Sequence, residues 1–408
     1  MTIKRDKAAL AFMLIVALSG LALGLSDSVM SNYFYDAYNV DAFQRGLIEF
    51  PREIPGVISV VIVSGLAFLG NIRLAIIAHV LSIIGIFVLG LASPPFMIML
   101  IFLFINSLGM HMFFPIYDSM AMSLAKKDDF GTTMGRFNGL RTGFTMVAAI
   151  IVFLGFRSGV FSFTSPVITI FVIAGALFTV ILGLLIFMGR QMEDVKAEKP
   201  RFVLNRAYSK FYLLAILFGA RKQIMYVYGP WVLIELLSFG ADRMALLIIA
   251  GSAIGIFFLP AVGRWIDRFG PGKIMIIEAA LFLVIYLGYG LISIEVGSAT
   301  AGLSVAAIAV LAVVVNIVDR MTIQFGMVRP VYMRSIAKSP EDVTPTLATG
   351  MALDHVVSIG SAIFSGFLWW EFGPQYVFVF AGLLALANML VAVRIKKDAD
   401  AANQTDVA

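Results

Sequence analysis

The sequence predicts an all-α membrane protein, because of its composition and the way its apolar residues are arranged. Of the 408 residues, 60% are apolar and 13% are charged, whereas soluble domains are about 45–50% apolar and about 25% charged. A soluble fold could not cover so much apolar surface. The apolar residues form continuous runs instead of alternating at every second position, which favours helices over a transmembrane barrel.

Twelve of these runs are long enough to cross a bilayer, which takes about 20 mostly apolar residues. They lie near residues 8–33, 46–69, 73–93, 96–122, 136–157, 165–189, 210–238, 243–264, 273–293, 302–335, 346–369 and 374–394. The first run follows three basic residues as a signal peptide would. It has no small-residue cleavage site and continues into polar residues 26–28, so we interpret it as a retained helix.

The basic residues predict the orientation of these helices. If both termini are cytoplasmic, 21 basic residues fall in cytoplasmic segments and only Arg45, Arg157 and Arg243 in outer loops. Basic residues are retained on the cytoplasmic side of a membrane. We therefore expect a multi-pass protein of a bacterial inner membrane or a plasma membrane, with both termini inside.

A charged segment after the sixth run divides the chain into halves. We predict a first six-helix half at 1–189, a cytoplasmic linker at 190–207, a second six-helix half at 208–395 and a cytoplasmic tail at 396–408. The segments 123–129 and 335–342 have similar sequences and follow the fourth and tenth runs. Their offset of 212 residues, about half the chain, is the offset that a duplication of six helices predicts.

One loop resembles a family signature. After the eighth run comes Gly263-Arg264-Trp265-Ile266-Asp267-Arg268-Phe269-Gly270, which is similar to the signature loop of the major facilitator superfamily (MFS), Gly-x-x-x-Asp-(Arg/Lys)-x-Gly. The resemblance implies two six-helix halves that rock around a site in the middle of the membrane. The corresponding loop of the first half, residues 65–73, has no Asp. Residues 139–143 lack the Pro of proton-antiporting drug exporters, which argues against a standard multidrug exporter.

Charges inside the predicted helices mark the candidate substrate site, because an ionisable group in the bilayer is costly and is usually functional and paired. The resemblance implies that the first, fourth, seventh and tenth helices line the cavity. Arg221 and Lys222 lie roughly 20 Å into the seventh helix. They require anions, which Asp27, Asp319 or a substrate carboxylate or phosphate could supply. We predict seven substrate-binding residues: Arg221, Lys222, Tyr226, Asn316, Asp319, Arg320 and Gln324.

Other intramembrane charges are candidates for proton coupling and for gating. Asp354 begins a polar stripe in the eleventh helix and His355 adjoins it, whereas Asp27 lies near the outer end of the first helix. We predict that Asp27, Asp354 and His355 take part in proton coupling. The predicted gating residues are Asp118, Arg141, Asp267, Arg268 and Arg329. A structural ion pair is the alternative interpretation of Asp319 and Arg320. For Asp27 the alternative is a helix-end carboxylate in contact with water, and for Asp267 and Arg268 it is a short charged turn. Glu278 is interpreted as a carboxylate that reaches the cytoplasmic surface, without a role.

These observations predict a secondary transporter. Its expected substrate is a small anionic or zwitterionic metabolite, moved by alternating access and coupled to protons, with sodium left open. Proton-driven efflux of amphipathic drugs or lipids is the alternative, and a membrane-embedded enzyme is a weaker one. The chain has no cysteine and no nucleotide-binding loop, and we expect no enzyme activity, cofactor or metal. The expected partners are the solute, protons and membrane lipids, with no nucleic acid, and the expected state is a monomer.

Overall fold

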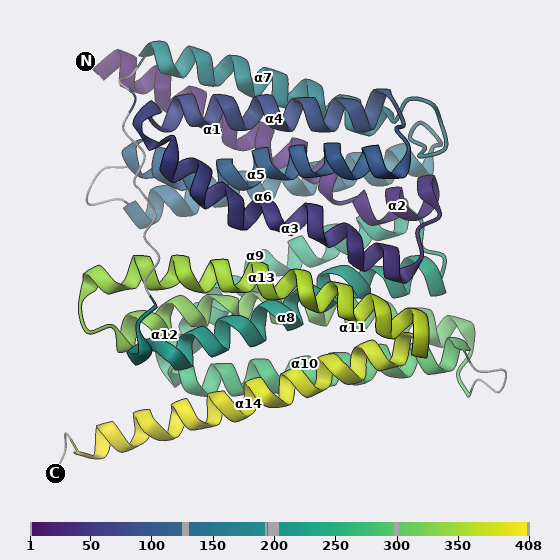
Figure 1. Cartoon of the computed structure of the whole chain (residues 1–408), viewed down its shortest axis with the longest axis vertical. Coiled ribbons are helices and arrows are strands. Elements are labelled where there is room, and N and C mark those ends of the chain that lie inside the picture. The colour runs from purple at the N-terminus through teal and green to yellow at the C-terminus, as the bar shows by residue number, and fades with distance from the viewer. Residues whose placement is uncertain (1, 125–129, 192–193, 195–203, 298–301, 406–408) are drawn as a thin grey trace. The chain divides into compact units, whose positions relative to one another are not determined.

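Helices form nearly all of the described chain in the computed structural model (Figure 1). The structure describes residues 2–124, 130–191, 194, 204–297 and 302–405. These residues belong to two compact units. The first comprises Met1–Asn39, Phe50–Pro200 and Gly240–Ile249, and the second comprises Val40–Glu49, Arg201–Phe239 and Ala250–Ala408. The predicted boundaries at residues 189 and 207 stay a prediction.

The helices follow the predicted runs. The first part of the chain contains α1 (Thr2–Asp27), α2 (Met30–Tyr38), α3 (Ala42–Gly65), the short η1 (Ala67–Leu69), α4 (Asn71–Leu91), α5 (Phe96–Leu124), α6 (Phe130–Arg157) and α7 (Thr169–Gln191). The second part contains η2 (Arg206–Tyr208), α8 (Ser209–Trp231), η3 (Val232–Leu236), α9 (Ala241–Phe269), α10 (Pro271–Gly297), α11 (Val305–Thr322), η4 (Ile323–Met327), α12 (Val328–Ile336), α13 (Pro340–Phe372) and α14 (Pro374–Thr405).

Ten helical stretches among the described residues are long and apolar enough to cross a membrane. Helices α3 and α8 have 24 and 23 residues, which also suffices for a span, but each carries several charged side chains. With these two, the structure agrees with the predicted twelve-helix fold. The predicted first helix is α1 followed by α2, and the predicted tenth is α11, η4 and α12 in succession.

Small residues bring helices α1 and α6 together in the first unit. A Cβ at Gly24 would lie 2.6 Å from Cβ of Ala148, and a Cβ at Gly20 would collide with the backbone carbonyl of Arg141. Gly20 and Gly24, which lie one helical turn apart, therefore allow α1 and α6 to pack closely. The same spacing recurs on α9 at Gly251 and Gly255. A Cβ at Gly251 would lie 2.7 Å from Cδ of Arg320, whereas a Cβ at Gly255 would meet nothing within 4 Å.

A carboxylate from the linker caps helix α4. Oδ1 of Asp194 accepts the backbone N–H of Ile72 at 2.8 Å, and Oδ2 accepts that of Arg73 at 3.1 Å. Gly70 precedes the helix with φ +90°, and a Cβ there would lie 2.5 Å from Cγ of Asp194. The loop that lacks the signature Asp thus receives a carboxylate from a residue more than 120 positions later, which satisfies free N–H groups at a helix start.

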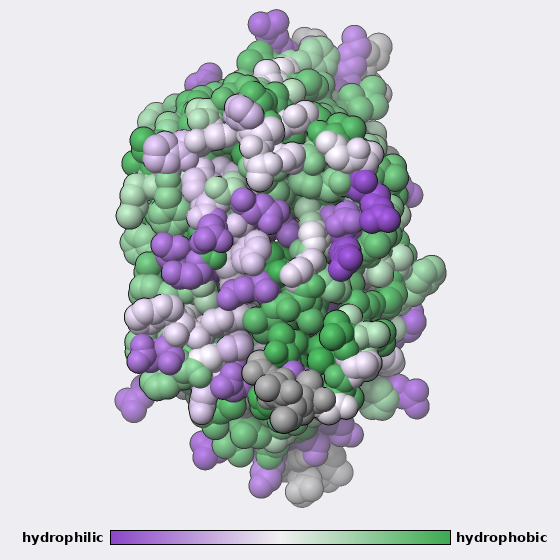
Figure 2. All heavy atoms as spheres, turned by 90° about the vertical axis from the view of Figure 1, so that its right-hand side faces the viewer, coloured by the Kyte–Doolittle hydropathy of each residue, from purple (hydrophilic) through white to green (hydrophobic). Residues whose placement is uncertain are grey.

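The molecular surface carries many large apolar side chains. Phe257, Leu287 and Leu383 are 79%, 67% and 60% exposed, and many other large apolar side chains are exposed too. Figure 2 faces the helix ends at the right of Figure 1, where hydrophilic side chains gather among apolar ones. Exposed large apolar side chains in such number are rare on soluble monomers. They are expected where helices face lipid, so the surface agrees with an integral membrane protein.

Candidate functional site

The neighbours Arg221 and Lys222 on α8 have different surroundings in the second unit. Successive side chains on a helix point about 100° apart, so two adjacent cations can serve different partners. Arg221 is fully buried, whereas the side chain of Lys222 is 24% exposed. Each of them has a carboxylate partner from a helix that lies far away in the sequence.

Arg221 belongs to a buried group of three charged side chains. Its Nη2 donates to Oε1 of Glu278 on α10 at 3.1 Å, and Nη2 of Arg329 on α12 donates to both oxygens of Glu278 at 2.9 Å. Glu278 and Arg221 are 0% exposed, and the side chain of Arg329 is 7% exposed. The guanidinium carbons lie over aromatic rings: Arg221 is 3.8 Å from the ring centre of Phe282, and Arg329 is 3.5 Å from that of Phe218.

These contacts correct two of our expectations. The carboxylate that pairs with Arg221 is that of Glu278, where we expected Asp27, Asp319 or a substrate. The interpretation of Glu278 as a surface-reaching carboxylate is wrong, because its side chain is 0% exposed. Helices α8 and α12 bring two guanidinium groups to it, which compensates its burial. Arg329, predicted as a gating residue, has its carboxylate partner here.

Lys222 forms the second ion pair. Its Nζ lies 2.6 Å from Oδ2 of Asp354 on α13, and the side chains are 24% and 19% exposed. Helix α8 makes room for this carboxylate with Gly219, where a Cβ would collide with Oδ1 of Asp354. Oδ1 itself is buried and has no hydrogen-bond partner among the described residues. A partly exposed ion pair of this kind remains accessible to a competing ion or to a proton.

The polar face predicted on α11 is present. Nε of Arg320 donates to Oδ1 of Asn316 at 3.1 Å, and Nδ2 of Asn316 donates to the hydroxyl of Tyr289 on α10 at 3.2 Å. Gln324, in η4, donates to the carbonyl of Arg320 at 3.4 Å. Asp319 makes no ion pair within the part of the chain that the structure describes, and its Oδ1 is buried without a hydrogen-bond partner.

A further buried polar group surrounds the start of α3 in the second unit. Arg45 and Glu49 form an ion pair one helical turn apart, both 0% exposed. Nε2 of Gln223 on α8 donates to Oε2 of Glu49 at 2.7 Å, and the Arg45 guanidinium lies 5.9 Å from the ring centre of Trp231. Arg45, expected in an outer loop, lies within α3.

The remaining predicted residues are distributed over both units. Asp27 pairs with Arg52 at 2.9 Å in the first unit. In the same unit Arg141 lies 5.4 Å from the ring centre of Tyr117, next to the exposed Asp118. Asp267 and Arg268 are both exposed in the last turn of α9. His355 is half-buried beside Asp354, and Tyr226 is 42% exposed one turn after Lys222.

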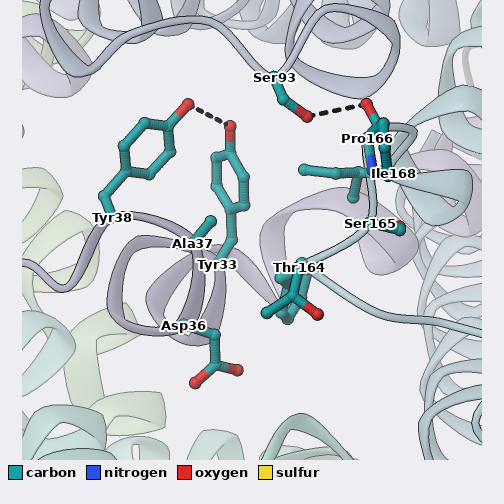
Figure 3. A pocket seen from close by; sticks show the side chains of 10 residues that line it. Tyr33, Asp36, Ala37, Tyr38, Ser93, Thr164, Ser165, Pro166 and Ile168 are labelled. Carbon is teal, nitrogen blue, oxygen red and sulfur yellow. Dashed lines mark hydrogen bonds between the residues drawn. The ribbon is translucent and has the colours of Figure 1, made fainter.

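The first unit also has an open pocket of about 400 Å³ at the end of α2 (Figure 3). The hydroxyls of Tyr33 and Tyr38 lie 3.0 Å apart, and that of Tyr38 donates to the carbonyl of Pro94 at 2.7 Å. Across the pocket, Ser93 donates to the carbonyl of Pro166 at 2.9 Å. Asp36 points away from the paired hydroxyls in this view. Most of the polar groups of the pocket are therefore satisfied by the protein itself.

Sequence reasoning missed the residues whose partners come from distant helices. Glu278, Gln223 and Asp194 were given no role, yet each satisfies a charge or a helix end. Their partners lie between 51 and 174 positions away. The sequence offered one signal for these partners. Two adjacent cations in α8 need two carboxylates, and Glu278 and Asp354 are acids in other predicted membrane helices.

The comparisons with known proteins agree with the fold. The chain matches the family model of the Major Facilitator Superfamily over residues 12–341. No curated protein sequence matches it. Among solved structures, a mutant of the nucleoside transporter NupG has a TM-score of 0.75 at 15% identity, covering 95% of this chain and 99% of that chain.

Two further structures are similar over most of their length. A POT family transporter in complex with a thioalcohol conjugated peptide has a TM-score of 0.74 at 11% identity, covering 95% of this chain and 96% of that one. A D-xylose-proton symporter has a TM-score of 0.65 at 16% identity, with the same two coverages. At such identities the structures show the fold, and the family model shows the family. The chain belongs to the Major Facilitator Superfamily and is a membrane transporter, not an enzyme.

Proposed function

We propose that this transporter moves a small organic anion or zwitterion by alternating access, coupled to protons, with both termini in the cytoplasm. The observation that carries the proposal is the ion pair of Lys222 and Asp354, which is partly exposed, whereas Glu278 and Arg221 are completely buried. The charges of a completely buried ion pair are unavailable to a solute. A partly exposed ion pair can exchange one partner for a solute.

The chemistry of this pair favours an anion or a zwitterion. A substrate carboxylate would compete with Asp354 for the ammonium of Lys222, and a substrate ammonium would compete with Lys222 for the carboxylate. An ammonium binds as a point charge with three donors, so it does not demand one planar geometry of the anion. Substrate binding and protonation of Asp354 would both release the same salt bridge, which links the solute to the proton.

Further polar residues of the second unit extend the proposed site. Tyr226 is 42% exposed one helical turn from Lys222. On α11, the Arg320 guanidinium uses Nε to bind Asn316, which orients its remaining donors. Arginine suits planar, bidentate binding of carboxylates and phosphates. The proposed site excludes Arg221, because its side chain has no exposed surface and already pairs with Glu278.

Ligand-dependent thermal stabilisation of the purified protein tests this proposal. The panel would hold organic anions, zwitterions, lipophilic cations and lysolipids, each at pH 6 and pH 8, because a ligand that binds the folded state raises its apparent stability. We expect anions or zwitterions to stabilise the protein, and Lys222→Ala to abolish the effect. Lys210→Ala is the matched control, since Lys210 forms an exposed pair with Asp398.

Stabilisation by lipophilic cations alone would contradict the proposed substrate class. It would favour the alternative of amphipathic drug efflux. An anion effect that Lys222→Ala and Lys210→Ala reduce equally would contradict the assignment to the Lys222–Asp354 pair.

A further inference from the structure

Three of the acids predicted to act in proton coupling or substrate binding have different surroundings in the structure. Asp27 and Asp354, two of the predicted proton carriers, each face a cation, at 2.9 Å and 2.6 Å. Asp319, predicted as a substrate ligand, forms no ion pair among the described residues. An ion pair favours the charged form of a carboxyl group. Among the described residues, no such ion pair holds Asp319 in its charged form.

Asp319 lies near the middle of a candidate membrane span. It is the fifteenth residue of the 32-residue span Val305–Ile336, or roughly 22 Å from its start at 1.5 Å per residue. Its side chain is half-buried, and Oδ1 is shielded from solvent with no hydrogen-bond donor. A buried oxygen of an ionised carboxylate needs a hydrogen-bond donor. A neutral carboxyl group has one oxygen that is itself a donor, and it costs far less to bury.

Arg320 and Arg221 lie within electrostatic range of Asp319, but neither forms an ion pair with it among the described residues. From α8, Arg221 lies within electrostatic range but pairs with Glu278. From α10, Tyr286 and Tyr289 face it with neutral hydroxyls, and that of Tyr289 is bonded to Asn316. From α9, Gly251 abuts the side chain of Arg320.

The following residue, Arg320, is the nearest cation. It directs its Nε to Asn316 instead of to Asp319. Tyr226 of α8 also lies within electrostatic range of Arg320.

We propose that Asp319 is a proton-binding site that is occupied in this conformation and that its proton controls the charge next to Arg320. With Asp319 neutral, the guanidinium of Arg320 is uncompensated by its neighbour and attracts an anion. When the proton leaves, the ionised Asp319 neutralises Arg320 and weakens the hold on the anion. The proton and an anionic solute would then bind together and leave together. This second statement rests on the proposed function, whereas the protonation itself does not.

Infrared difference spectroscopy tests the protonation without any substrate. The spectrum of the wild type minus that of Asp319→Asn should contain the C=O stretch of a protonated carboxylic acid at neutral pH. Asp354→Asn is the matched control, because Asp354 faces Lys222, and it should leave this band in place. Absence of the band, or its loss in Asp354→Asn to the same degree, would overturn the inference.

Anion binding tests the coupling. In the wild type, the thermal shift caused by a stabilising organic anion should be larger at pH 6 than at pH 8. In Asp319→Asn, which mimics the neutral acid, we expect the shift at pH 8 to rise to that at pH 6. A shift in Asp319→Asn that keeps the pH dependence of the wild type would overturn the coupling. If no anion stabilises the wild type, the proposed function fails, while the infrared result still decides the protonation.

Discussion

Arg221 and Lys222 are consecutive residues, and their two ion pairs show what burial does to a charge in a membrane helix. The first pair lies in a closed group in which Glu278 serves two arginines, and the rings of Phe218 and Phe282 cover the guanidinium faces. The second pair keeps about a quarter and a fifth of its side-chain surface exposed. The comparison indicates that the first pair holds helices together, and it is the basis of our proposal that the second takes part in transport.

The largest expected effect comes from Glu278→Ala. Removing one partner of a buried ion pair leaves uncompensated charges and typically costs about 3–5 kcal/mol, and here two guanidinium groups lose their carboxylate at once. Thermal unfolding in detergent should show a large fall in Tm. The triple variant Glu278→Leu, Arg221→Met, Arg329→Met is the control, and it should recover much of the loss. An unchanged Tm in Glu278→Ala would contradict the structural role of the group.

Gly219→Ala should have the next largest effect. The added Cβ would collide with Oδ1 of Asp354, which must shift away from Lys222, and overpacking of this kind costs typically about 1–3 kcal/mol. Gly255→Ala is the matched control on α9, because its Cβ would meet nothing within 4 Å. We expect the control to be neutral or slightly stabilising, since Ala favours helix over Gly by about 1 kcal/mol. Equal Tm changes in both variants would contradict the contact.

Lys222→Ala should leave the fold nearly intact and remove transport. The ion pair is partly exposed, so water can reach Asp354 when Lys222 is removed, and we expect a smaller loss of stability than in Glu278→Ala. Exchange of labelled solute in proteoliposomes should fall to the background of empty vesicles, while Tm without ligand stays close to that of the wild type. A fall in Tm as large as that of Glu278→Ala would remove the distinction between the two pairs.

The smallest effect concerns a carboxylate outside both groups. Asp194→Ala deprives helix α4 of two hydrogen bonds to its first N–H groups, and loss of a helix cap costs typically about 1 kcal/mol. Asp267→Ala is the matched control, because Asp267 is an exposed side chain in the last turn of α9. Thermal unfolding should show a lower Tm for Asp194→Ala and an unchanged Tm for Asp267→Ala. A larger fall in Tm for Asp267→Ala than for Asp194→Ala would contradict the capping role of Asp194.

The sequence predicted the helices because each span is encoded locally by a continuous apolar run. Helices α3 and α8 show the limit of this signal, since their charges lower their apolar character and only their partners explain those charges. The polar face of α11 was also predictable, because Asn316, Arg320 and Gln324 recur at helical spacing and the structure joins them by hydrogen bonds.

Pairing between distant helices could not be read from the sequence. Asp354 was recognised as a functional candidate, but its partner is 132 positions away, and no local pattern identifies Lys222 as that partner. The interpretation of Glu278 is wrong because its position along α10 does not show that α8 and α12 cover its side chain. The protonation that we propose for Asp319 rests on the lack of an ion-pair partner and of a donor to Oδ1 among the described residues. Only the packed helices show this.

Solute counterflow in proteoliposomes tests the central claim most directly. Vesicles loaded with an unlabelled organic anion or zwitterion that stabilises the protein would take up the labelled form from outside. The account predicts transient accumulation with the wild type and with Lys210→Ala, and none with Lys222→Ala. Counterflow that Lys222→Ala supports at the wild-type rate would contradict the claim that the exposed ion pair, and not the buried one, handles the solute.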